Sequence, residues 1–197
     1  MEGLKLNLFG DILRREIING KVYLMAGASK NHNEVVKNLT WALENFLRGK
    51  KCRLFGENMN VKFDEDSPEV LPDIKIVCDP GKITKKNIEG APDLIVEVLS
   101  KRTRVKDITE KKYLYERHGV KEYWIIDTNS KIIEVYLLKD GKFVLDYIYT
   151  KFDEDDIEEI EAGTEEEREM LKVTTIKTSL YGDDLIISIA DIFENVD

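Results

Sequence analysis

The segment 122–127 (EYWIID) constrains the fold of this chain more than any other feature. Its residues are nearly all apolar, and a strand without polar alternation is buried on both faces of a sheet. A helix is predicted just before it, from Asp107 with Glu110 three residues later, to the stop at His118-Gly119. The strand-like run 93–99 precedes that helix. The chain therefore contains a strand, helix, strand unit whose last strand is covered from both sides.

Upstream segments extend this unit into a larger order of elements. A helix is predicted from the cap Asn31, with Glu34 three residues on, to Gly49. Strands are predicted at 52–63 and 73–78, and a short strand at 21–26 follows the Asn19-Gly20 turn. The core order is thus α-β-β-β-α-β, with an added N-terminal strand. A mixed sheet packed against helices, an α/β (α+β mixed sheet) fold, is the natural architecture.

The C-terminal part is predicted to extend the same domain. Segments 131–138 and 142–150 flank Asp140-Gly141 and indicate a hairpin with a primed turn. We expect the acidic segment 153–169 to be either a solvated loop or a surface helix. Further short elements are expected at 173–178, 184–189 and 190–194. A length of 197 residues suits one domain. We therefore expect a single domain over 1–197, with its core at about 30–127 and a C-terminal β extension.

The charge of the chain excludes one class of nucleic-acid binder. A formal net charge of −9 argues against a protein that holds nucleic acid by overall attraction. Most of this charge lies in 153–169, and the rest of the chain is close to neutral. A protein that binds nucleic acid through a local site is therefore still compatible with the composition.

Other features concern location and cofactors. No apolar run approaches the roughly 20 residues of a membrane span, and the charged N-terminus does not resemble a signal peptide. We therefore expect a cytoplasmic protein without a membrane partner. Cys52 and Cys78 are the only cysteines, and we expect both to be reduced core thiols. With His32 and His118 as the only histidines, a structural zinc site is not expected.

Glu97 breaks the pattern of its strand. Alternation places Leu94, Val96 and Val98 on one face, and Asp93, Ile95, Glu97 and Leu99 on the other. A carboxylate in the middle of an apolar strand is costly to bury unless a charged group pairs with it. Either the strand lies at a sheet edge, where Glu97 reaches water or an arginine, or Glu97 has a metal-binding or catalytic role.

Asp73 follows Pro72 at the start of another apolar run. By residue type alone it is a turn or strand-start carboxylate. If 73–78 and 93–99 are antiparallel neighbours, however, Asp73 lies within reach of Glu97. Two such hard oxygen ligands suit Mg²⁺, which takes one or two carboxylates plus waters and phosphate oxygens.

Two groups of basic residues follow. The inward stripe of the 107–118 helix is expected to run through Ile108, Lys111, Leu114 and Tyr115. Lys111 either extends its ammonium into solvent or directs it toward the carboxylate pair and a phosphate. Just after the Glu97 strand comes a basic cluster, which is either a solvated loop or a nucleic-acid-binding contact with the phosphate backbone: Lys101, Arg102, Arg104 and Lys106.

These motifs resemble those of the Uma2 (DUF820) family, a restriction-endonuclease-like branch of the PD-(D/E)xK nucleases. The resemblance spans roughly residues 15–135, with a weaker echo in IADIFE near the C-terminus, and rests on five co-linear segments: INGKVYLMAGASKNH (18–32), LPDIKIV (71–77), GAPDLIVEVLS (90–100), the Asp107…Glu110-Lys111…Tyr115…Gly119-Val120 pattern, and EYWIID (122–127).

Residue by residue, the resemblance places the PD motif on Pro72-Asp73 and the acidic position of (D/E)xK on Glu97. Leu99 stands where the broad pattern has a lysine, and related sequences carry that lysine on the following helix, here Lys111. His32, Glu34 and Asp93 are additional candidates. His32 and Glu34 head the first helix, and Asp93 is expected to be a strand-start or supporting residue about 13 Å from Glu97.

The function implied is phosphodiester hydrolysis of DNA, with Asp73 and Glu97 binding Mg²⁺ or Mn²⁺ and Lys111 assisting. A homodimer is expected because palindromic cutters of this fold use two subunits. One alternative is a catalytically inactive nuclease-fold module for nucleic-acid or protein binding. Another is an acidic protein-interaction domain that acts through 153–169.

Overall fold

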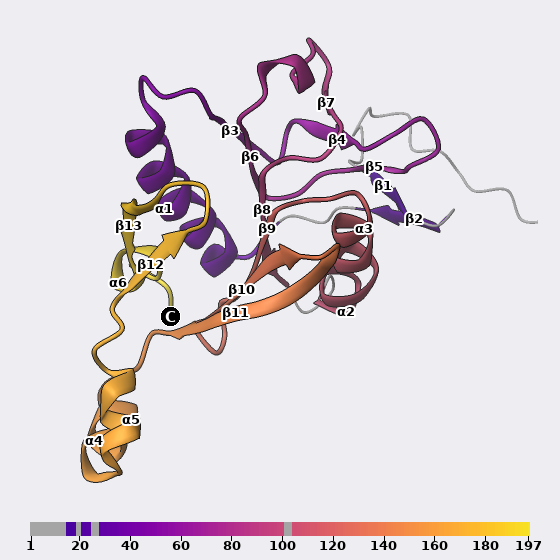
Figure 1. Cartoon of the computed structure of the whole chain (residues 1–197). Helices are drawn as coiled ribbons and strands as arrows, with labels where there is room; N and C mark the ends of the chain where they lie inside the picture. The colour runs from indigo at the N-terminus through magenta and orange to yellow at the C-terminus, as the bar shows by residue number, and fades with distance from the viewer. Residues whose placement is uncertain (1–14, 19–20, 25–27, 101–103) are drawn as a thin grey trace, which may run out of the picture.

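A six-stranded sheet forms the centre of the computed structural model, which describes residues 15–18, 21–24, 28–100 and 104–197 (Figure 1). The strand order is β11-β10-β9-β8-β6-β3. Only β8 and β9 run parallel, and the other neighbours are antiparallel. The strands are β3 (Arg53–Gly56), β6 (Ile74–Val77), β8 (Leu94–Leu99), β9 (Glu122–Asp127), β10 (Ile132–Lys139) and β11 (Lys142–Thr150). The expected mixed sheet is confirmed.

Helix α1 (Lys30–Leu47) covers one face of this sheet. Val35, Leu39 and Leu43 recur at helical spacing and are fully buried. The helix begins two residues earlier than predicted, because the Ser29 side chain, rather than that of Asn31, accepts a hydrogen bond from the His32 amide. Gly49, at φ +77°, follows its C-cap. This conformation is easy for glycine and ends the helix where the sequence predicted.

The opposite face is covered by the helical connection between β8 and β9. It consists of α2 (Arg104–Lys106), a π-helical turn η2 (Asp107–Lys111) and α3 (Lys112–Arg117). Figure 1 shows this connection on the side of the sheet away from α1. The parallel pairing of β8 with β9 requires such a crossover.

Strand β9 is buried on both faces, as its composition predicted. Trp124 and Ile126 join the hydrophobic cluster beneath α1. Tyr123 and Ile125 join a second cluster, which Tyr115 of α3 covers. The sheet therefore separates two cores, and every side chain of β9 except that of Asp127 is buried.

The C-terminal hairpin continues the central sheet. Asp140 and Gly141 both have positive φ, 52° and 76°, which are the values of the predicted primed turn. Strand β11 pairs with β10 on one side only, so it is an edge of the sheet within the described part of the chain.

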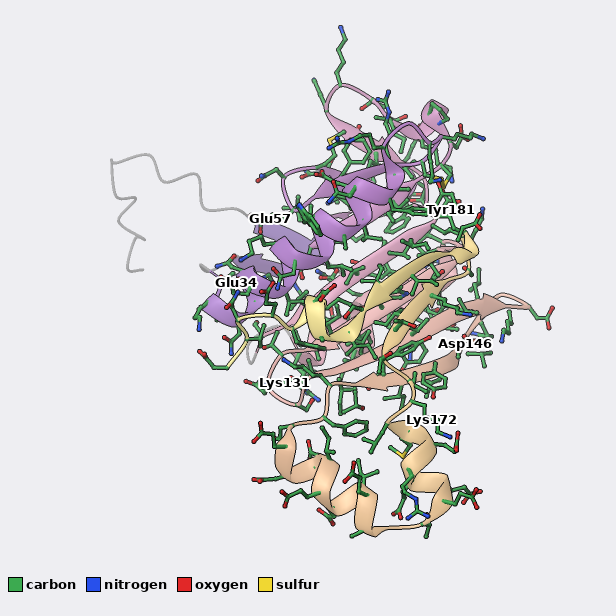
Figure 2. The ribbon with its side chains drawn as sticks, turned by 90° about the vertical axis from the view of Figure 1, so that its left-hand side faces the viewer. Glu34, Glu57, Lys131, Asp146, Lys172 and Tyr181 are labelled. Carbon is green, nitrogen blue, oxygen red and sulfur yellow. A yellow bond between two sulfur atoms is a disulfide. The ribbon has the colours of Figure 1, made fainter. Side chains whose placement is uncertain are left out.

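The acidic segment forms two helices. Both α4 (Glu154–Ala162) and α5 (Glu165–Met170) start with a capping box, at Asp153 and Thr164. No residue of either helix is buried. Figures 1 and 2 show the pair projecting away from the sheet, with Lys172 labelled near its base in Figure 2. Of the two predicted states, helix is the correct one.

Several shorter elements complete the fold. The predicted strand 52–63 is divided by a turn into β3 and β4 (Asn60–Lys62), which pairs in a separate small sheet with β5 (Glu69–Val70) and β7 (Asn87–Glu89). A 3-10 turn, η1 (Pro80–Lys82), precedes β7. The remaining elements are β1 (Arg15–Ile18), β2 (Lys21–Leu24), β12 (Thr175–Thr178), β13 (Gly182–Ser188) and α6 (Ile189–Ile192).

The prediction of reduced cysteines is wrong for this structure. Cys52 and Cys78 form a disulfide, with their Cα atoms 3.9 Å apart. The register of β3 with β6 pairs Arg53 with Val77, so the two cysteines come at matching positions just beyond the ladder. Spacing along the chain could not reveal this proximity, because it arises from strand pairing.

No helix in the described ranges is long and apolar enough to cross a membrane.

Candidate functional site

The pairing of β6 with β8 brings the two predicted acidic residues together. Ile74 lies opposite Val96, and Lys75 opposite Ile95, so the next pair along the ladder is Asp73 and Glu97. Asp73 Oδ2 accepts a hydrogen bond of 2.7 Å from the amide of Val98. The carboxylate of Asp73 is thereby fixed against the strand that carries Glu97, as the antiparallel arrangement predicted.

Glu97 is a buried carboxylate in the middle of the sheet. Its side chain is 3% exposed, and β8 lies between β6 and β9. The alternative of an edge strand is therefore wrong. Glu97 Oε1 accepts from Lys111 Nζ at 2.8 Å and from the hydroxyl of Tyr115 at 2.6 Å. These charge-assisted hydrogen bonds offset the cost of burying the carboxylate.

The π-helical turn η2 directs two charged residues into the site. Asp107 and Lys111 are both buried, and Lys111 Nζ lies 3.5 Å from Asp107 Oδ1. The alternative in which Lys111 extends into solvent is therefore wrong. The predicted inward position of Ile108 is also wrong, since this side chain is 38% exposed. A π turn is wider than an α turn and changes which residues face inward, so Asp107 takes the place expected for Ile108.

His32 reaches the site from the beginning of α1. Its Nε2 lies 3.3 Å from Asp73 Oδ1. Burial lowers the pKa of His32, but the hydrogen bond and charge of Asp73, together with the charges of Glu57 and Asp107, outweigh it, so the pKa is raised. Glu34, the other candidate on this helix, instead pairs with Lys37.

Lys75 is a site residue that the sequence analysis missed. Its side chain is fully buried, and Nζ donates to the carbonyl of Pro72 at 3.0 Å. Burial lowers the pKa of Lys75 to about 8, although the charges of Glu97 and Asp73 oppose this. A signal was available, because residues two apart on a strand share a face. That alternation places Lys75 on the face of Asp73.

Asp93 does not belong to this group. It precedes the opposite end of β8, where its carboxylate accepts from the Cys78 amide and from Lys121 Nζ, both at 2.7 Å. Although burial opposes it, these hydrogen bonds lower the pKa of Asp93. Asp93 therefore connects β6 to the segment before β9, in keeping with the supporting role expected for it.

The basic cluster is only partly described. Lys101 and Arg102 lie outside the described residues. Arg104 is half-exposed and forms an ion pair with Asp127, the last residue of β9. Lys106 is buried, with 7% of its surface exposed. Of these two residues, Arg104 carries its positive charge at the surface, whereas Lys106 is buried.

The donor set of the site is compatible with a hard divalent cation. No cluster of three or more His, Cys, Asp and Glu side chains suited to a metal occurs in the described ranges. Asp73 and Glu97, however, supply carboxylate oxygens from neighbouring strands. Mg²⁺ is commonly held by one or two carboxylates, with waters completing its coordination. The pair therefore fits Mg²⁺ or Mn²⁺ better than a metal that needs a full cage of protein ligands.

Comparison with known proteins supports the fold. A structure described as a putative nuclease belonging to DUF820, from Anabaena variabilis, superimposes with a TM-score of 0.64 at 19% identity. The match covers 91% of this chain and 89% of that one. This likeness confirms that the chain shares the fold of that protein.

Sequence comparison supports the family. Two uncharacterized proteins of Synechocystis sp. are 28% and 29% identical over 124 and 126 residues, 62% of this chain in each case. The matched parts are 65% and 71% of those relatives' lengths. The model of the Uma2 family, described as "putative restriction endonuclease", matches residues 2–173. This match extends beyond the resemblance seen in the motifs and includes the acidic helices α4 and α5. The chain belongs to the Uma2 family.

Proposed function

We propose that this protein is a metal-dependent nuclease that hydrolyses phosphodiester bonds of DNA. The observation that carries the proposal is the placement of Asp73 beside Glu97 on one sheet face, with the Lys111 ammonium 2.8 Å from Glu97. Family membership supports nuclease-like chemistry at the coarse level. The metal, the substrate and the roles of single residues are our proposal.

Asp73 and Glu97 would hold Mg²⁺ or Mn²⁺. When bound, such an ion supplies an activated water and neutralises charge on the phosphate. The protein holds both carboxylates in fixed positions: the Val98 amide and His32 contact Asp73, and Lys111 and Tyr115 contact Glu97. Fixed ligands lower the cost of ordering the site when substrate arrives.

Lys111 would stabilise negative charge on the phosphate during the reaction. Lys111 is 3% exposed, and a charge acts more strongly in such a water-poor environment than in solvent. Asp107, 3.5 Å away, keeps a counter-charge beside it. Lys111 thus places an ammonium group beside the carboxylates. It would take the role of the motif lysine, whose position on β8 is occupied by Leu99.

The test is a cleavage assay with plasmid, single-stranded DNA and RNA in Mg²⁺, Mn²⁺ or EDTA. Glu97→Gln and Lys111→Ala are compared with Glu116→Gln and Lys112→Ala, matched changes outside the site. We expect metal-dependent cleavage that falls at least about 100-fold in the first pair and persists in the second. Undiminished cleavage by Glu97→Gln would contradict the proposal.

The same assay addresses the alternative of an inactive nuclease-fold module. That protein would cleave nothing under any condition. Calorimetric titration would also show no Mn²⁺ binding that depends on Asp73. If the protein cleaves RNA in preference to DNA, the site residues stay as proposed, and RNA replaces DNA as the proposed substrate.

We also propose a homodimer acting on DNA in the cytoplasm. Two copies are what a symmetric cut of both strands requires. Sedimentation with and without a DNA duplex tests the assembly, and a monomer in both states would rule it out.

A further inference from the structure

The burial of Lys75 is not explained by an ion pair. Its ammonium bonds to a backbone carbonyl, and no carboxylate lies within 4 Å of it in the described part of the chain. Burying a charged group is expensive, and an apolar side chain of similar size would cost less. The adjacent residues on this face, such as Val77 and Ile95, are apolar and fully buried. Stability alone would therefore favour an apolar residue at this position.

The position of Lys75 relates it to the candidate site. It lies two residues from Asp73 and directly opposite Ile95, which is itself two residues from Glu97. The charges of Asp73 and Glu97 both act on its ammonium. The spacing acid-x-lysine, absent at Glu97-x-Leu99, is thus present at Asp73-x-Lys75 on the neighbouring strand.

The hydrogen bond of Lys75 adds a mechanical link. Pro72, whose carbonyl it binds at 3.0 Å, immediately precedes Asp73. The lysine side chain therefore folds back along its own strand and fixes the backbone on the N-terminal side of Asp73. The charge of Lys75 thus acts on the carboxylate of Asp73, and its hydrogen bond holds the backbone just before that residue.

The buried carboxylates near the site outnumber the buried ammonium groups, so a bound cation would compete with the two lysines for the same carboxylates. Three carboxylates, those of Asp73, Glu97 and Asp107, are accompanied by the ammonium groups of Lys75 and Lys111. Lys111 contacts Glu97 and lies near Asp107, whereas Lys75 is attracted to the carboxylates from a greater distance. A divalent cation bound by Asp73 and Glu97 would be repelled by Lys75.

We propose that Lys75 is a positioning residue of this site, whose buried charge holds Asp73 and Glu97 together without a metal and limits how tightly a divalent cation binds there. This inference rests on the proposed function, which assigns Asp73 and Glu97 as the metal ligands. It adds a second lysine, on β6, that acts through the carboxylates rather than on the substrate.

The test is calorimetric titration of Mn²⁺ into the wild-type chain, Lys75→Met and Lys75→Gln. Both variants remove the charge, and Gln retains a donor for the Pro72 carbonyl. We expect both to bind Mn²⁺ roughly tenfold more tightly, since one nearby positive charge is removed. Cleavage should slow, mainly through kcat, because Asp73 is held less firmly. Lys121→Met, which removes a lysine from Asp93 at the other end of β8, should leave both values unchanged.

A merely structural role would give the opposite sign, with weaker Mn²⁺ binding together with a lower Tm. Unchanged or weaker binding in both variants overturns the inference, as does the absence of Mn²⁺ binding in all proteins. If the wild type binds Mn²⁺ but cleaves no nucleic acid, the proposed function fails. A tighter Kd in the variants would then still support the role of Lys75.

Discussion

Two regions of this molecule are rich in acidic side chains, which are buried in one region and exposed in the other. On the sheet face beneath α3, Asp73, Glu97 and Asp107 are buried among two lysines. In the helical pair α4–α5 the acidic side chains lie in solvent, as Figure 2 shows for the projecting helices. The net charge of −9 therefore comes from the exposed helices α4 and α5, and it does not predict the charge of the buried site. Buried charges interact strongly with their partners, whereas exposed ones are screened.

The largest effect should come from breaking the buried pair of Glu97 and Lys111. Glu97→Gln leaves the ammonium of Lys111 buried with less compensation, so we expect a loss of about 3 kcal/mol in the free energy of unfolding. The double variant Glu97→Gln/Lys111→Met should lose clearly less than the sum of the single changes. Urea unfolding of the wild type, the two single variants and the double variant measures these losses. If the losses of the single variants add up to that of the double variant, the two groups are not coupled.

Lys75 should produce an effect of similar size that depends on pH. Its pKa is about 8 in the folded protein against 10.5 for an ordinary lysine, so the unfolded chain binds more protons between these values. Stability should therefore rise as pH increases through this window, by about 3 kcal/mol from this group. Lys75→Met should lack that rise and be more stable than wild type at pH 7. Parallel pH curves for the two proteins would contradict the prediction.

His32 should show a weaker dependence of the opposite sign. Its pKa is raised above 6.5 in the folded state, so its stabilising contribution is fully present below pH 6.5. It is lost as pH rises through the folded pKa. We expect His32→Gln to cost about 1 kcal/mol at pH 5.5 and less at pH 9. Thermal unfolding at both pH values measures this, with His118→Gln as the control. An equal cost at both would exclude Asp73 as the cause.

The smallest effects should come from the acidic pair of helices. Thr164→Ala removes the capping box of α5 and should weaken that helix by about 1 kcal/mol. Hydrogen exchange should report this in α5 only, without a change in cleavage. Glu159→Gln, an exposed charge in α4, should change stability by less than about 0.5 kcal/mol. Loss of cleavage in either variant would show that the two acidic regions are not independent.

Much of the site was accessible from the sequence because its signals are local. Alternation along 93–99 placed Glu97 on the face opposite to Val96, and the pairing of two apolar runs placed Asp73 beside it. The same rule would have found Lys75, two residues from Asp73. Its apolar neighbours, however, favoured an interpretation as an ordinary strand.

The sequence by itself determined the α-β-β-β-α-β order of the core, the double-sided burial of 122–127, the turn at Asp140-Gly141 and the end of α1 at Gly49. These features depend on alternation, backbone conformation and contacts within a few residues.

Tertiary structure alone decided the π turn that brings Asp107 inward, the disulfide between Cys52 and Cys78, and the pairing of Asp93 with Lys121. It also decided that Glu97 is satisfied by Lys111, 14 positions away, and that Asp73 is held by Val98, 25 positions away. The physical reason is that the cost of burying a charge depends on which groups surround it. Those groups come together only when distant segments pair.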